Sequence, residues 1–112
     1  MEHYYTQNPQ TPHDIRSIVF SAGNIRLELY TDAGVFSRNK VDYGSEWLIR
    51  SLPKLSGNIL DLGCGYGAIG LSIAFSNPDA RVMMVDINQR AVDLSLRNIE
   101  RNRIQNAVAH LS

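Results

Sequence analysis

The clearest pattern near the start of the chain is an alternation of hydrophobic and polar positions across residues 25–31. Ile25, Leu27 and Leu29 are apolar and the residues between them are polar, which is the period of a strand with one face in water. A second strand-like stretch, residues 15–20, precedes it, and Gly23-Asn24 lies between the two. This arrangement predicts an antiparallel hairpin.

Residues on either side of the hairpin are polar. We expect residues 1–14, with two prolines, to form an extended arm, and residues 31–43 to form a connector. A helix is expected from residue 44, with Ser45 as its N-cap and Pro53 ending it. Its predicted buried stripe consists of Trp47, Leu48 and Leu52.

From residue 59 the pattern changes to short apolar runs that alternate with helical periods. The predicted elements are a strand at 59–62, a glycine-rich turn at 63–67, a helix at 68–76, a strand at 81–86, a helix at 88–102 and a strand at 107–111. This order predicts α/β structure with parallel strands and right-handed crossovers. Because the strands are almost continuously apolar, we expect both sheet faces to be covered.

Two or three parallel strands leave an open sheet edge. We therefore expect the 112 residues to be the amino-terminal part of one longer domain, with the arm and hairpin at 1–43 and the ligand-binding half at 44–112. The alternative is that another chain covers the edge, so that the protein self-associates there.

Composition narrows the class of protein. Eleven basic residues balance eleven acidic ones, so no bulk charge draws the chain to nucleic acid or to an anionic membrane. A single cysteine, Cys64, excludes an internal disulfide, and the three histidines lack metal-ligand spacing, so no metal is expected. Without a membrane-length apolar run or a secretory signal, the expected location is cytoplasmic.

The candidate chemistry lies in the segment Asp61-Leu62-Gly63-Cys64-Gly65-Tyr66-Gly67 and in Asp86, which ends the next strand. Glycines at a strand-to-helix turn allow positive φ and close approach of a ligand to the backbone. The helix amino terminus presents unpaired N–H groups, and Asp86 emerges at the carboxyl edge of the sheet. A carboxylate there can accept both hydroxyls of a ribose, which indicates an adenosine-containing cofactor.

Two cofactors fit this turn. Residues 65–70 match the dinucleotide pattern G-x-G-x-x-G, with Asp86 near the expected distance downstream. Asp61, however, would repel a pyrophosphate and attract a ligand with an ammonium and a sulfonium. This carboxylate favours S-adenosylmethionine over a nicotinamide dinucleotide.

Structural roles compete with these functional ones. Asp61 could cap the following helix, and Asp86 could be a turn residue at a strand end. Cys64 is expected to be a small residue that fits rather than a reactive thiol. Tyr66 could line the pocket or only pack.

The glycine segment and residues 85–88 resemble motifs I and II of class I S-adenosylmethionine-dependent methyltransferases. Together with residues 34–37, 41–45 and 65–70, they resemble the methyltransferase small domain family over about residues 4–112. That family includes bacterial enzymes that methylate guanine N2 in ribosomal RNA. The resemblance implies an incomplete Rossmann-like methyltransferase fold.

By this resemblance, Asp61 and the backbone of Gly63 and Gly65 hold the methionine end of the cofactor. Cys64, between the two glycines, is also expected to be a cofactor-binding residue. Asp86 binds the ribose hydroxyls and Ile87 covers the adenine ring. Asp42 and Ser45 shape the entrance.

The family's Asn-Pro-Pro stretch, which orients the amine to be methylated, does not occur in the 112 residues. The resemblance thus implies methyl transfer to a nucleic-acid base, with guanine N2 of ribosomal RNA as the expected target, and no catalytic residue in this chain. The alternatives are a non-catalytic remnant that binds a cofactor or partner and, less favoured, an NAD-dependent oxidoreductase.

Overall fold

A computed structural model of the chain describes residues 12–33 and 39–112. Most of the predicted arm and the motif at 34–37 lie outside these residues. The described elements are β1 (Arg16–Ala22), β2 (Ile25–Thr31), α1 (Tyr43–Ser51), β3 (Gly57–Leu62), α2 (Ala68–Ser76), β4 (Ala80–Asp86), α3 (Gln89–Arg101) and β5 (Ala107–Leu111).

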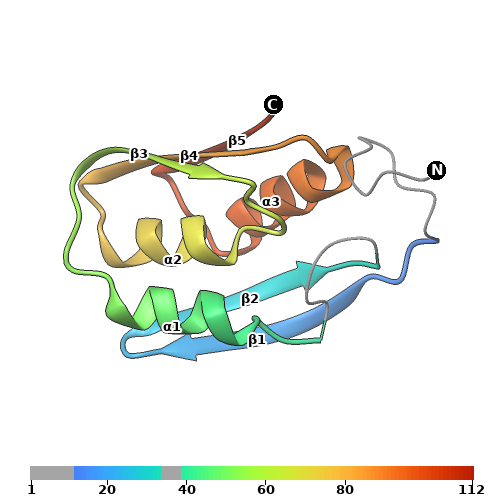
Figure 1. Cartoon of the computed structure of the whole chain (residues 1–112), viewed down its shortest axis with the longest axis horizontal. Coiled ribbons are helices and arrows are strands. Elements are labelled where there is room, and N and C mark those ends of the chain that lie inside the picture. The colour runs from blue at the N-terminus through green and yellow to red at the C-terminus, as the bar shows by residue number, and fades with distance from the viewer. Residues whose placement is uncertain (1–11, 34–38) are drawn as a thin grey trace.

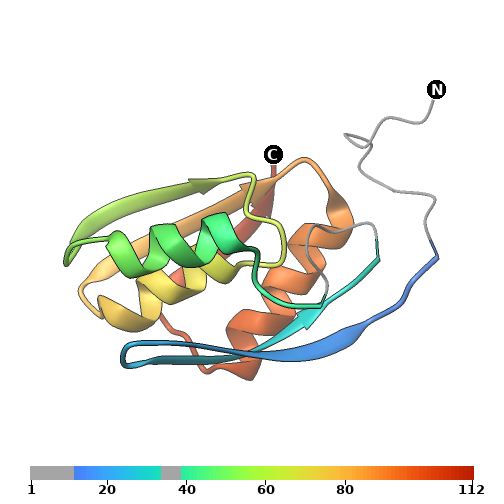
Figure 2. The same ribbon diagram turned by 60° about the horizontal axis from the view of Figure 1, so that its bottom comes forward.

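The elements form three layers. The β1–β2 hairpin makes one outer layer, the β3–β4–β5 sheet makes the other, and the helices lie between them (Figure 1). Turning the molecule shows α1 beside α2, and α3 against the hairpin (Figure 2). The core therefore lies in the helical layer, where Leu27 and Leu29 of β2, Leu71 of α2 and Met84 of β4 are fully buried.

The hairpin is confirmed as predicted. β1 pairs antiparallel with β2, and Phe20 faces Leu27 across the ladder. Ile25, Leu27 and Leu29 are buried while Arg26 between them is exposed, because alternate side chains of a strand point to opposite faces.

The prediction for α1 is wrong in two respects. Asp42, not Ser45, is the N-cap: its carboxylate accepts hydrogen bonds from the Ser45 backbone N–H at 3.1 Å and from the Ser45 hydroxyl at 2.6 Å. The predicted stripe is wrong for Trp47 and Leu48, which are 66% and 40% exposed, and it omits the buried Ile49. Leu52, its third member, is partly buried against the core. Within the described residues, Ile49 is the buried side chain of α1, and Trp47, its largest apolar side chain, faces water.

The parallel sheet has the predicted topology, with β3 beside β4 and β4 beside β5. The prediction that both faces are covered is wrong for the described residues. The helices all lie on one side of the sheet (Figure 1), and several large apolar side chains of the other face are exposed. They include Leu60, Leu62, Met83 and Val108.

Among the described helices, none has the length and apolar character needed to cross a membrane.

Candidate functional site

The glycine turn joins the carboxyl end of β3 to the start of α2. Gly63, Gly65 and Gly67 have φ values of 74°, 57° and 101°. L side chains rarely adopt this left-handed region, so the alternate glycines allow a sharp strand-to-helix reversal. Gly67 is itself the N-cap of α2 and offers no side chain to the first turn of that helix.

Asp61, on β3, supplies that missing cap from outside the helix. Its Oδ2 accepts a hydrogen bond of 3.0 Å from the Gly70 N–H, so the capping role considered for Asp61 is real. Burial, with the nearby charge of Asp86 adding to it, raises the pKa of the Asp61 carboxyl above its usual value despite the Gly70 hydrogen bond. Within the described residues, no basic side chain forms an ion pair with Asp61.

Asp86 ends β4 and holds the turn from the neighbouring strand. Its Oδ2 accepts from the Gly65 N–H and its Oδ1 from the Asn88 N–H, both at 2.9 Å. The carboxylate thus has the turn role that sequence reasoning considered for it. Ile87, the next residue, is 38% exposed beside this carboxylate and is available to a ligand.

A cavity of about 100 Å³ opens at the turn. It brings together four of the predicted ligand-binding residues with the two predicted entrance residues, Asp42 and Ser45. The complete lining is Asp42, Ser45, Asp61, Gly63, Cys64, Gly65, Tyr66, Ala68 and Ile69. Asp86 and Ile87 are not part of this lining; Asp86 connects to it through Gly65.

Tyr66 and Cys64 have both structural roles and places in the cavity wall. Burial, followed by the charge of Asp42, raises the pKa of Tyr66 to about 12, and its hydroxyl donates to the Lys40 carbonyl at 3.4 Å. Burial likewise raises the pKa of the Cys64 thiol to about 11. A thiol that is protonated at neutral pH is a weak nucleophile, which supports a packing role for Cys64.

Two residues of α3 support the turn from behind, and sequence reasoning missed both. The Ser95 hydroxyl donates to the Gly65 carbonyl at 2.8 Å, and the Asn98 amide donates to the Tyr66 carbonyl at 2.8 Å. Both side chains are 0% exposed. The available signal was their spacing of three residues on the helix face that also carries the buried Ala91 and Leu94.

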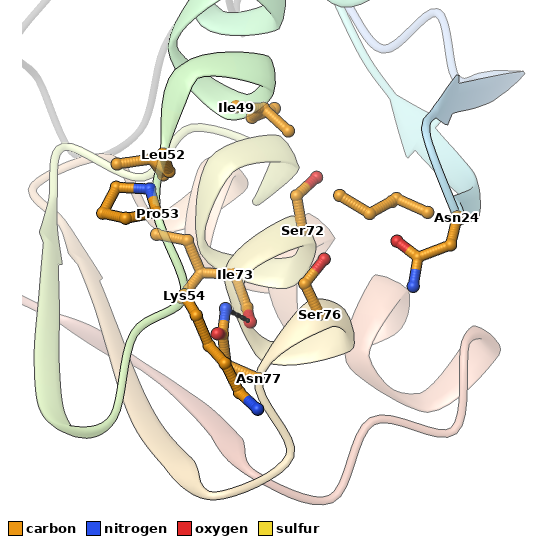
Figure 3. A pocket seen from close by; sticks show the side chains of 10 residues that line it. Asn24, Ile49, Leu52, Pro53, Lys54, Ser72, Ile73, Ser76 and Asn77 are labelled. Atoms are coloured by element: carbon orange, nitrogen blue, oxygen red, sulfur yellow. Dashed lines mark hydrogen bonds between the residues drawn. The ribbon is translucent and has the colours of Figure 1, made fainter.

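A second cavity, of about 330 Å³, lies at the opposite end of α2, next to the hairpin turn (Figure 3). Ser72 and Ser76 of α2, Asn24 of the hairpin and Lys54 line it together with apolar side chains. The Ser72 hydroxyl is buried and has no hydrogen-bond partner among the described residues. This cavity contains none of the predicted ligand-binding residues.

In residues 12–33 and 39–112 no cluster of acidic, histidine and cysteine side chains could hold a metal ion.

Most of the chain matches a known protein family. Residues 26–112 match the sequence profile of the family described as the methyltransferase small domain. The chain is 43% identical to a protein called YbxB from Bacillus subtilis, over 99% of this chain and 56% of that protein. It is 44% identical to ribosomal RNA small subunit methyltransferase C of Aeromonas hydrophila, over 78% of this chain and 25% of the enzyme. The chain thus spans about half the length of the first relative and a quarter of the second.

Solved structures show the same arrangement of elements. The 16S rRNA N2 G1207 methyltransferase of T. thermophilus, solved with AdoMet and guanosine, superposes with a TM-score of 0.78 at 29% identity. The match covers 91% of this chain and 29% of the enzyme. A Pyrococcus abyssi tRNA (uracil-54, C5)-methyltransferase superposes with a TM-score of 0.66 at 22% identity, over 86% of this chain and 23% of that one, which supports the fold alone.

Proposed function

Because the chain belongs to the methyltransferase small domain family, we propose that its glycine turn binds S-adenosylmethionine for transfer of a methyl group to ribosomal RNA. The observation that carries this proposal is the Asp61 carboxylate. It lines the cavity, its pKa is raised by burial, and no described cation neutralises it. A buried carboxylate without a cation partner is electrostatically costly, and a cationic ligand removes that cost.

The residues around the turn suit the different parts of the cofactor. Asp61 accepts from the ammonium of the methionine part, which the backbone of Gly63, Cys64 and Gly65 encloses. Asp86 still has acceptor capacity for the ribose hydroxyls, because each carboxylate oxygen has two lone pairs and accepts one hydrogen bond from a described backbone N–H. Ile87 packs against the adenine.

The same residues disfavour a dinucleotide. Asp42 and Asp61 both line the cavity, and a pyrophosphate there would meet two carboxylates. The third glycine of the G-x-G-x-x-G pattern, Gly70, serves the packing of α2 on β4, because a Cβ there would lie 2.5 Å from the Met84 sulfur. The pattern therefore has a structural explanation that requires no phosphate.

S-adenosylmethionine supplies a methyl group that its sulfonium activates for transfer to a nitrogen in line with the carbon–sulfur bond. The contribution of this chain is to fix the position of that methyl group, and alignment of the reacting atoms provides much of the acceleration in such reactions. We place the acceptor at the exocyclic N2 of guanine in ribosomal RNA. The relative from Aeromonas hydrophila, a ribosomal RNA small subunit methyltransferase, supports ribosomal RNA as the substrate, and the 16S rRNA N2 G1207 methyltransferase supports guanine N2.

Calorimetric titration tests the cofactor. S-adenosylmethionine is expected to bind the wild-type chain, and NAD is expected to give no binding heat. Asp86→Ala is expected to weaken binding at least about tenfold, the effect of losing one good hydrogen bond to a charged group. Asp79→Ala, a change at an exposed residue between α2 and β4, is the matched control and is expected to bind as the wild type does. Binding of NAD in place of S-adenosylmethionine would refute the proposal.

The acceptor is tested separately with the full-length protein and methyl-labelled S-adenosylmethionine. After incubation with ribosomal RNA, nucleoside analysis is expected to recover the label in N2-methylguanosine. Label in any other nucleoside would contradict the assignment of guanine N2 and leave the cofactor assignment standing.

A further inference from the structure

We propose that Asn98 of α3 is a positioning residue that ties the β1–β2 hairpin to the cofactor-binding turn. This inference rests on the proposed function, since it assigns a task to a residue behind the proposed cofactor site. The hairpin would then take part in shaping that site, although it supplies none of the residues that line the cavity at the turn.

The first observation is the set of bonds made by the Asn98 amide. Its Nδ2 donates to the Tyr66 carbonyl of the turn at 2.8 Å and to the Tyr30 carbonyl of β2 at 3.0 Å. Its Oδ1 accepts from the Tyr30 backbone N–H at 2.7 Å. One fully buried side chain therefore satisfies both backbone groups of a β2 residue and one carbonyl of the turn.

The second observation is a neighbouring asparagine that makes only part of this arrangement. Asn102, one turn further along α3, accepts from the Glu28 N–H at 2.9 Å and donates to the Glu28 carbonyl at 2.9 Å. Its amide also donates to the Asn98 carbonyl of its own helix, at 2.8 Å. Asn102 thus holds the same edge of β2 in the same way and, among the described residues, forms no hydrogen bond with the turn.

The third observation is that donors from different elements hold the carbonyls of the turn. The Cys64 carbonyl accepts from Gly67 and the Gly65 carbonyl accepts from Ser95 of α3. The Gly67 carbonyl accepts from Leu71 within the start of α2. The Tyr66 carbonyl accepts from Asn98, whose side chain is also bound to β2. Removing Asn98 takes away this buried hydrogen bond, which orients the peptide plane that joins Tyr66 to Gly67.

The pair of asparagines allows a matched experiment in the 112-residue chain. Asn98→Ala and Asn102→Ala each remove two bonds to β2, and only Asn98→Ala removes the bond to the turn. We expect both variants to lose thermal stability, with the larger loss in Asn98→Ala because that change also removes the buried bond to the turn. Asn98→Ala is expected to bind S-adenosylmethionine about tenfold more weakly than Asn102→Ala, which corresponds to one buried hydrogen bond.

A readout without ligand separates positioning from general weakening. In amide NMR spectra at a temperature where both variants are folded, Asn98→Ala is expected to shift and broaden the resonances of Gly65 and Gly67. Asn102→Ala is expected to leave them near their wild-type positions. Should Asn98→Ala fail to fold, Asn98→Ser, which keeps a short donor, replaces it against Asn102→Ser.

The two proposals fail in different ways. Absence of S-adenosylmethionine binding by the wild-type chain refutes the proposed function, and the amide spectra still decide the role of Asn98. Equal affinities and unchanged glycine resonances in the two variants refute the positioning role and leave the proposed function in place.

Discussion

At the scale of single residues, the site depends on a carboxylate with two tasks. Asp61 caps α2 through Gly70 and faces the cavity without an ion-pair partner among the described residues. The first task needs only an oxygen acceptor, whereas the second needs the negative charge. Asn at this position can perform the first task and cannot perform the second, which makes the two separable.

Asp61→Asn is therefore expected to stabilise the free chain at pH 7 and to weaken S-adenosylmethionine binding at least about tenfold. Because burial raises the folded-state pKa of Asp61 above 3.8, this group makes the wild type lose stability as pH rises from that value through the folded pKa. The variant lacks this loss. Thermal unfolding and titration calorimetry at several pH values measure both effects.

The same carboxylate predicts the pH dependence of binding. A cationic ligand favours ionised Asp61, so wild-type affinity is expected to rise as pH increases through the raised pKa and then to level off. Asp61→Asn is expected to lack this rise. A parallel rise in the variant would assign the pH dependence to another group.

Gly70 gives a second prediction at this scale. A Cβ there would lie 2.5 Å from the Met84 sulfur and 2.9 Å from Asp61 Oδ2, so Gly70→Ala is expected to cost about 1–3 kcal/mol of stability. Gly44→Ala is the control, because its Cβ would make an ordinary contact of 3.4 Å with Asp42. That change in an exposed helix is expected to be neutral or stabilising by up to about 1 kcal/mol in chemical denaturation. Equal tolerance of the two changes would contradict the packing role of Gly70.

The sequence alone predicts the two carboxylates of this site but not the residues of α3 that hold the turn from behind. Asp61 and Asp86 stand out because carboxylates at the ends of apolar parallel strands lie at the sheet edge where ligands bind. Ser95 and Asn98 do not stand out, because a polar residue in a helix ordinarily faces water, whereas here both are buried against the glycine turn and Asn98 also against the hairpin. That packing joins residues about 70 positions apart, such as Tyr30 and Asn98, and no local pattern reports it.

At the scale of elements, α2 is capped at its start but carries a buried hydroxyl without a described hydrogen-bond partner at its middle. Its start is capped by Asp61, while Ser72 lies buried beside the second cavity with a hydroxyl that lacks a described partner (Figure 3). Ser95 of α3 offers a comparison, because it is equally buried but donates to Gly65.

Ser72→Ala is expected to stabilise the chain by about 1 kcal/mol, since it removes an unsatisfied buried hydroxyl and introduces a better helix former. Ser95→Ala is expected to destabilise it by about 1 kcal/mol through the lost hydrogen bond to the turn. Chemical denaturation measures both. A loss of stability in Ser72→Ala equal to that in Ser95→Ala would show that the Ser72 hydroxyl has a partner in the cavity.

Periodicity predicted the hairpin, the two βα units and their order, and failed at the start of α1. Asp42 and Ser45 are both good capping residues three positions apart, so composition alone did not separate them. The inner face was missed for a separate reason: the prediction takes the large apolar residues Trp47 and Leu48 as buried, whereas the helix turns Ile49 inward.

At the scale of the whole molecule, one sheet face remains uncovered in the described chain. Leu60, Met83 and Val108 are 58%, 45% and 47% exposed on it, and a cavity of about 640 Å³ runs over these strands. Contiguous exposed apolar surface of this kind promotes association in water. The open edges of β3 and β5 add unpaired backbone groups.

We therefore expect the isolated chain to self-associate as its concentration rises in sedimentation experiments. The double change Leu60→Lys and Val108→Lys is expected to shift the chain towards monomer. Val19→Lys, at a residue 58% exposed on the hairpin, is expected to sediment as the wild type does. A wild type that remains monomeric at every concentration would contradict this prediction.

If Asp61 receives the cationic end of S-adenosylmethionine at the glycine turn, a crystal structure of the complex will show the contact. We expect the ligand ammonium within hydrogen-bond distance of the Asp61 carboxylate, with the ribose hydroxyls on Asp86. A complex in which Asp61 lies far from the bound nucleoside, or in which the turn instead holds a pyrophosphate, would contradict it.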